Sequence, residues 1–152
     1  MGFFSRIFGI CRTKPPADQA CWRYSDGRVE VNLAQAKELA VKGGAVRLEG
    51  RGLPFRLLVV QGEDGGFYAF RNQCTHMGRR LDPWPGRPQL ECCSVSKSRY
   101  EYSGAKVSGP AKGPVQTLPV EREGQTLTIR LGRSPGHTSR RSGTRWKEKA
   151  KL

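Results

Sequence analysis

The chain has 152 residues, of which 36% are hydrophobic, with 19 glycines, 10 prolines and a formal net charge of +14. This length favours one domain with room for tails, and the many turn residues favour an all-β fold over a helical one. No stretch approaches the roughly 18 apolar residues that a transmembrane helix needs. No secretory signal peptide is evident, because Arg6 interrupts the only apolar run near the start. We therefore expect a cytoplasmic protein, in which clustered Cys and His more often bind metal than form disulfides.

Residues 1–21 form an N-terminal segment ahead of the predicted domain. Its apolar side chains fall on one face of a short predicted helix, with Arg6 and Arg12 beside them. This pattern is consistent with contact of residues 1–12 with a membrane surface; the alternative is a segment that docks on the domain or frays. Cys11 and Cys21 have no other ligand converging on them, so we expect both to be free thiols.

Residues 22–131 are the predicted domain, in which short alternating or apolar runs are separated by turn signals. We expect a short helical or turn insert at 33–41 that ends at Gly43 and Gly44. Residues 82–88 have the composition of a turn, and Trp84 within them either shields a site from water or packs on the surface. Strands are expected at 28–31, 45–49, 57–60, 67–70, 89–91, 100–102, 106–108, 115–121 and 126–131.

Two clusters of soft ligands lie in the middle of the domain, Cys74-Thr75-His76 and Cys92-Cys93. Thiolates and imidazoles are the side chains that hold zinc, copper and iron–sulfur clusters. The spacing Cys-x-His within one loop lets both side chains converge on one site. A loop rich in Gly and Pro, residues 109–114, follows the second cluster. This layout predicts two metal-binding hairpin tips held under a third loop.

The first cluster and the third loop resemble the Rieske family. Cys74-Thr75-His76-Met77-Gly78 with Leu81 resembles the first Rieske loop, Cys-x-His-x-Gly-x-x-Leu. Ser98-Arg99-Tyr100 followed by Gly104 resembles the segment after the second Rieske loop, and Gly109-Pro110-Ala111 with Pro114 resembles the proline loop. The resemblance covers about residues 28–131. It implies antiparallel sheets with two ligand-bearing hairpin loops and a [2Fe–2S] cluster held by two Cys and two His.

The second loop departs from the family. Aligning Ser98-Arg99-Tyr100 with the family places the loop's cysteine at Cys93 and its histidine at Ser96. The resemblance then implies that Cys74 and Cys93 hold one iron and that His76 holds the other. The only other histidine of the chain lies in the basic tail.

Several hypotheses for the fourth ligand stay open. Ser96 could bind as an alkoxide, a harder donor than sulfur or imidazole, or a small molecule or partner side chain could fill the position. Cys92 could supply a third thiolate, although adjacent strand residues point to opposite faces, so Cys92 and Cys93 reach one site only if the loop kinks. Zinc would accept Cys74, His76, Cys93 and Cys92 as a tetrahedral set. The last hypothesis is a Rieske-like fold without a cluster.

The function implied by the resemblance is electron transfer of the kind that small Rieske ferredoxins carry out. We expect a carrier and not a complete enzyme, with no small-molecule substrate, because the chain is too short for the larger catalytic domain of Rieske oxygenases. Basic residues near the loops predict an acidic redox partner protein; they are Arg79, Arg80, Lys97 and Arg99. The rival hypothesis is a cluster-free β-domain that acts as a binding or regulatory module.

Residues 132–152 hold seven Lys or Arg and one Glu, without apolar periodicity. This composition predicts a disordered tail. Its charge either keeps the chain in solution or binds an acidic partner or nucleic acid. Nucleic-acid binding ranks last among the hypotheses.

Overall fold

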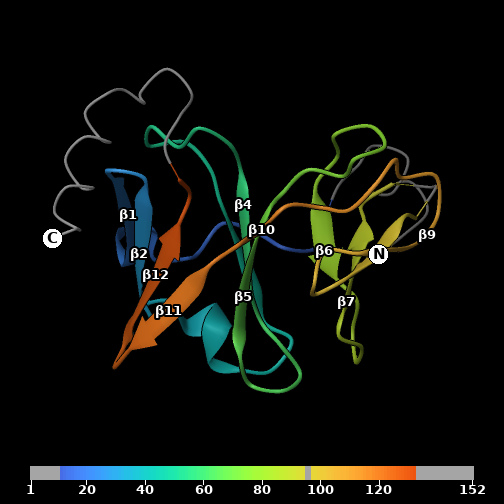
Figure 1. Cartoon of the computed structure of the whole chain (residues 1–152). Coiled ribbons are helices and arrows are strands. Elements are labelled where there is room, and N and C mark those ends of the chain that lie inside the picture. The colour runs from blue at the N-terminus through green and yellow to red at the C-terminus, as the bar shows by residue number, and fades with distance from the viewer. Residues whose placement is uncertain (1–10, 95–96, 133–152) are drawn as a thin grey trace, which may run out of the picture.

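The structure, a computed structural model, describes residues 11–94 and 97–132 (Figure 1). Within these residues the chain forms antiparallel strands and two short 3-10 helices, so the prediction of an all-β fold is confirmed. The strands are β1 Trp22–Ser25, β2 Arg28–Asn32, β3 Ala45–Leu48, β4 Leu57–Gln61, β5 Phe67–Arg71, β6 Leu81–Pro83, β7 Gln89–Cys92, β8 Arg99–Glu101, β9 Lys106–Ser108, β10 Thr117–Leu118, β11 Val120–Glu123 and β12 Thr126–Arg130; the helices are η1 Gln19–Cys21 and η2 Lys37–Ala40.

The strands build three four-stranded sheets in the orders β1-β2-β12-β11, β10-β5-β4-β3 and β6-β7-β8-β9. The first two sheets enclose one hydrophobic core. Val29 and Val31 of β2 and Leu127 and Ile129 of β12 are fully buried in it, and their neighbours along each strand face outward. This alternation is typical of strands with one face on a core and one in water.

The continuous apolar run at residues 57–60 lies in strand β4, which is covered on both faces. Leu57 and Val59 pack into the core between the first two sheets, whereas Leu58 and Val60 pack into a second core. All four side chains are fully buried. Because both faces of β4 are covered, its sequence cannot alternate between apolar and polar residues.

The second core joins the third sheet to the second. Phe70 of β5 packs there with Leu81 of β6, Leu90 of β7 and Tyr100 of β8, all fully buried. Figure 1 shows β6, β7 and β9 at one end of the molecule, away from β1, β2 and β12. The first predicted loop lies between β5 and β6, the second between β7 and β8, and the third between β9 and β10.

Two strands were not expected. β1 pairs with β2 across Asp26-Gly27, both with positive φ (49° and 74°), which is the Asp-Gly hairpin turn that sequence reasoning overlooked. β6 lies where only turns were predicted, and Pro83 pairs with Leu90. Pro83 is tolerated because β6 is the edge strand of its sheet, so its missing N–H breaks no ladder bond on that side.

Some sequence-based predictions fall on residues that the structure does not describe. The predicted membrane contact concerns residues 1–12, of which 1–10 lie outside the described part, and the basic tail lies there from residue 133 onward. Both stay predictions. Within the described residues, no helix is long and apolar enough to cross a membrane.

Candidate metal centre

The first loop, residues 74–80, is fixed at its base by backbone and side-chain hydrogen bonds. The Cys74 N–H donates to the Arg79 carbonyl and the Gly78 N–H to the Cys74 carbonyl, both at 2.8 Å. The Arg56 guanidinium donates to the carbonyls of Asn72 and Gly78, the latter at 2.6 Å. Gly78 has φ 74°, a left-handed conformation that favours glycine. These hydrogen bonds therefore fix the position of Cys74 through the protein's own contacts.

Asn72 closes the same loop from inside the protein. Its side chain is 1% exposed, and its Oδ1 accepts a hydrogen bond from the Leu81 N–H at 2.7 Å. This contact sets the start of β6 directly after the loop. Neither Asn72 nor Arg56 belongs to a recognisable sequence motif, so their roles could not be predicted from the sequence.

The sulfur of Cys74 lies in a polar cradle although the residue is only 1% exposed. The Cys92 thiol forms a hydrogen bond with it, the Tyr100 hydroxyl lies 3.2 Å away and the His76 N–H 3.5 Å away. These hydrogen bonds, the one with Cys92 first, hold the pKa of Cys74 below the ordinary value of a thiol. The interaction with Cys74 and burial raise the pKa of the Cys92 thiol in turn.

Tyr100 completes this cradle. Burial, followed by its hydrogen bond to Cys74, raises the pKa of Tyr100 to about 12, so its hydroxyl keeps its proton. The Thr75 N–H donates to the same hydroxyl at 3.1 Å, which orients it. A thiolate is the form in which cysteine binds metal, so Cys74 is prepared as a ligand.

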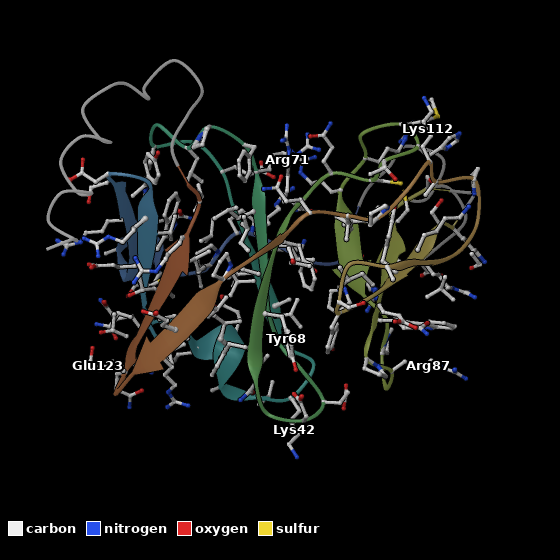
Figure 2. All side chains as sticks on the ribbon, viewed as in Figure 1. Lys42, Tyr68, Arg71, Arg87, Lys112 and Glu123 are labelled. Atoms are coloured by element: carbon white, nitrogen blue, oxygen red, sulfur yellow. A yellow bond between two sulfur atoms is a disulfide. The ribbon has the colours of Figure 1, made fainter. Side chains whose placement is uncertain are left out.

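The third loop, residues 109–114, packs on both ligand loops. The Thr75 hydroxyl donates to the Gly113 carbonyl at 2.8 Å, and the Ala111 N–H donates to the Ser98 hydroxyl at 3.0 Å. Figure 2 shows Lys112 of this loop at the outer edge of the molecule. The loop thus covers the region between Thr75 and Ser98.

Gly109 makes this packing possible, and its replacement gives a sharp test. It has φ 92°, and a Cβ on it would lie 2.5 Å from the Ser98 Cα. We expect Gly109→Ala to lower the free energy of unfolding by about 1–3 kcal/mol, because both strain and overlap oppose the side chain. Gly113→Ala in the same loop is the control, since a Cβ there meets nothing within 4 Å. Chemical denaturation that finds equal losses for the two variants would contradict this account.

The second loop places its two cysteines differently from each other. Cys92 ends β7 and packs into the second core with Cys74. Cys93 forms a disulfide with Cys11, 82 residues away, with a Cα–Cα distance of 5.4 Å. The expectation that Cys11 is a free thiol is therefore wrong, whereas Cys21 is free and buried. Ser96 lies outside the described residues.

A short N-terminal strap, residues 11–18, explains how Cys11 reaches Cys93. The N–H groups of Arg12 and Thr13 donate to the two carboxylate oxygens of Asp82 at 2.8 and 2.9 Å. The Arg12 guanidinium also donates to the Pro83 carbonyl at 3.0 Å. The Asp82 side chain is 5% exposed. Because these partners are about 70 residues apart along the chain, no local spacing in the sequence signals the contact.

Because of the strap, the possible ligand atoms that lie close together are not the set that the sequence predicted. Among the described residues, one group of three possible ligand atoms lies within 4.8 Å of one another, from Cys11, Asp82 and Cys93. Cys74, His76 and Cys93 do not form such a group. The hydrogen bond that His76 donates to the Cys74 sulfur comes from the backbone N–H of His76. The structure thus brings Cys92 to Cys74, and Cys93 to Cys11.

Two of the four predicted basic residues are engaged in ion pairs. Arg80 pairs with Glu49 at 2.6 Å, which holds the pKa of that carboxyl below its ordinary value. Arg99 pairs with Glu91 at 3.2 Å and lies 3.8 Å over the ring of Trp84. Arg87 stacks on the same ring at 4.7 Å. Trp84 therefore packs with arginines, which favours its role as a surface-packing aromatic.

A hollow of about 230 Å³ opens beside the first loop. Cys74 and Thr75 contribute to its wall on one side, and Arg71 and Gln73 also line it. Figure 2 shows Arg71 and Lys112 along the same edge of the molecule. The buried sulfur of Cys74 is thus close to a surface depression that has basic residues near it.

Comparison with known proteins identifies the class. The sequence profile of the Rieske [2Fe-2S] domain matches residues 29–119. The chain therefore belongs to the Rieske [2Fe-2S] domain family, as the resemblance of its first and third loops predicted.

The sequence also matches part of a much longer curated protein. The carotenoid phi-ring synthase of Chlorobaculum tepidum is 29% identical over 100 residues, which is 66% of this chain and 15% of that protein. The chain thus spans less than a sixth of that relative's length.

Solved structures share the fold. The ferredoxin of carbazole 1,9a-dioxygenase from Nocardioides aromaticivorans has a TM-score of 0.55 and 23% identity, covering 68% of this chain and 98% of its own. The plasma membrane Rieske protein PetC3 from Synechocystis has a TM-score of 0.51 and 21% identity, covering 62% and 92%. At such identities the likeness concerns the fold alone.

At the first loop, the donor that the structure describes as fitting the family's cluster is Cys74. Cys74 is buried, and its hydrogen bonds hold the pKa of its thiol below the ordinary value. A second thiolate is available if Cys93 is released from Cys11, or if Cys92 gives up its proton to a metal ion. The fit therefore depends on the state of the cysteines in the second loop.

Proposed function

We propose that this chain is a one-electron carrier that holds a [2Fe-2S] cluster in a variant Rieske site. The observation that carries this proposal is the cradle around Cys74, in which the Cys92 thiol, the Tyr100 hydroxyl and the His76 N–H converge on a buried sulfur. Burial by itself raises the pKa of a thiol, and an apolar core has no need of a thiolate. Hydrogen bonds to ligand sulfurs are also among the features by which proteins set cluster potentials.

The ligands in this proposal are Cys74, His76 and Cys93, with Ser96 or Cys92 at the position of the family's second histidine. When bound, the cluster takes up and releases a single electron. The chain's own residues do the rest. Tyr100 and the backbone stabilise negative charge on Cys74, and the third loop, fixed on Thr75 and Ser98, limits the access of water.

An acidic redox partner fits the surface around this site. Arg71 lines the hollow beside Cys74, and Lys97 and Lys112 of the neighbouring loops are exposed. Opposite charge on a partner would steer encounter and fix its orientation. Another solved structure with this fold is a complex of reduced oxygenase and oxidized ferredoxin in carbazole 1,9a-dioxygenase. We propose an analogous role for this chain as a component that serves a larger oxidoreductase in the cytoplasm, and we expect no small-molecule substrate of its own.

A second candidate function is supported by one observation. The disulfide with Cys11 occupies the sulfur that the family uses to hold iron. A chain that keeps this disulfide permanently would be a cluster-free β-domain that acts as a binding or regulatory module. Zinc bound by Cys74, His76, Cys92 and Cys93 is a further alternative, which also requires the disulfide to open.

The test is anaerobic reconstitution of the reduced protein with ferrous iron and sulfide. We expect equal amounts of iron and acid-labile sulfide, with visible absorption, and their near-complete loss in Cys74→Ser. Cys21→Ser is the matched control, because Cys21 is equally buried but packs in the other core. Cys92→Ser and Ser96→Ala then locate the fourth ligand. A reduced protein that stays colourless would contradict electron transfer, and stoichiometric zinc in it would point to a structural site.

A further inference from the structure

We propose that the Cys11–Cys93 disulfide is a redox latch that decides whether the metal centre can be loaded. This inference rests on the proposed function, because it concerns the supply of one ligand to the same site. A sulfur atom that is bonded to another sulfur cannot bind iron as a thiolate. Cys93 therefore has two mutually exclusive partners, Cys11 in the oxidised chain and the cluster in the reduced one.

The geometry shows which sulfur opens the latch. Cys93 is 2% exposed, whereas Cys11 is half-buried at the start of the strap. Thiol–disulfide exchange begins with attack of an external thiolate on an accessible disulfide sulfur. A dithiol reductant thus attacks Cys11 and forms a mixed disulfide with it, and Cys93 leaves as the thiolate. The second thiol of the reductant then releases Cys11, so the reductant becomes a disulfide and the chain gains two electrons and two protons.

The strap keeps the latch ready to close again. Its hydrogen bonds to Asp82 and Pro83 do not involve the disulfide, and the Arg47 N–H donates to the Lys14 carbonyl at 3.1 Å. After reduction these bonds hold Cys11 beside Cys93. The effective concentration of one thiol at the other stays high, so the disulfide is expected to re-form when the surroundings become oxidising.

Cys92 does not share this control. It faces the second core and hydrogen-bonds with Cys74, away from the strap. Of the two cysteines in the second loop, Cys93 is therefore the one whose availability depends on redox state. The latch leaves the Cys74 cradle intact in both states, because Tyr100 and His76 reach Cys74 without the strap.

The experiment compares wild type, Cys11→Ser and Cys21→Ser after equilibration in anaerobic thiol–disulfide buffers of different potentials. Disulfide content is read by alkylation and mass spectrometry, and iron and sulfide are then measured after reconstitution. We expect loading of wild type and Cys21→Ser to fall in proportion to the disulfide formed. Cys11→Ser should load to the same extent at every potential. Cys11→Ala serves as a second variant, with folding checked by near-ultraviolet circular dichroism.

Three outcomes would overturn the latch. Disulfide-bonded wild type that loads as fully as the reduced protein would show that Cys93 is not needed. Loss of iron from Cys11→Ser under reducing conditions would make Cys11 a ligand instead of a competitor. Failure of all variants to load at any potential would overturn the proposed function together with the latch. The first two outcomes leave the one-electron carrier standing and change only its ligand set, the first by removing Cys93 and the second by adding Cys11.

Discussion

Reduction of the Cys11–Cys93 disulfide is expected to lower the free energy of unfolding by about 4 kcal/mol. The bond joins residues separated by 82 positions, and closing a loop of that size removes much of the entropy of the unfolded chain. The loss is large beside the 5–15 kcal/mol that typically stabilises a small domain. Urea denaturation of the oxidised and reduced protein measures it directly.

Cys11→Ser provides the reference for this prediction. It should unfold like reduced wild type under both oxidising and reducing conditions. Cys21→Ser, which leaves the disulfide intact, should show the same difference between the two conditions as wild type. Equal stability of oxidised wild type and oxidised Cys11→Ser would show that the bond does not form in solution.

Asp82→Ala is expected to destabilise the protein by about 3 kcal/mol when measured in the Cys11→Ser background. Its buried carboxylate accepts two charge-assisted hydrogen bonds from the strap, each worth about 1.5–3 kcal/mol. Without it, the N–H groups of Arg12 and Thr13 lose their partner. Asp82→Asn keeps one acceptor oxygen and should cost about half as much. The measurement is chemical denaturation without the disulfide, so that the covalent bond does not mask the loss.

An exposed carboxylate is the control for Asp82. Glu121 pairs with Arg130 at 3.1 Å with a side chain that is 65% exposed. Exposed pairs contribute about 0–1 kcal/mol, so Glu121→Ala should have little effect. If Glu121→Ala lowered the free energy of unfolding as much as Asp82→Ala, burial of the Asp82 carboxylate would not be the reason for its larger contribution. In the chain that keeps Cys11, Asp82→Ala should also make the disulfide easier to reduce, because the strap no longer holds the two sulfurs together.

The parts of the fold that sequence reasoning predicted are those set by local pattern. Alternation identified β2 and β12, and the apolar run identified β4, whose two covered faces account for it. The failures have local causes as well. β6 was missed because Pro83 and its neighbours have the composition of a turn, although an edge strand tolerates proline.

The candidate site could be proposed from the sequence where its residues lie within one loop. Cys74 and His76 share a motif, and the third loop contacts Thr75 between them; their roles as ligands stay predictions. The Cys11–Cys93 bond could not be found in this way, because it depends on a strap that crosses to Asp82 from the far end of the chain. Likewise, the alternation along β7 indicated that Cys92 and Cys93 diverge, but not which of them faces Cys74.

The measurement that tests the central claim most directly is electron paramagnetic resonance of the reconstituted protein after one-electron reduction. The account predicts a signal of about one unpaired spin per two irons. It also predicts nitrogen coupling that disappears in a His76→Cys variant, because His76 is the proposed imidazole ligand. Reduced Cys11→Ser protein that retains neither iron nor sulfide and gives no signal would contradict the claim, since every proposed ligand is then free to bind.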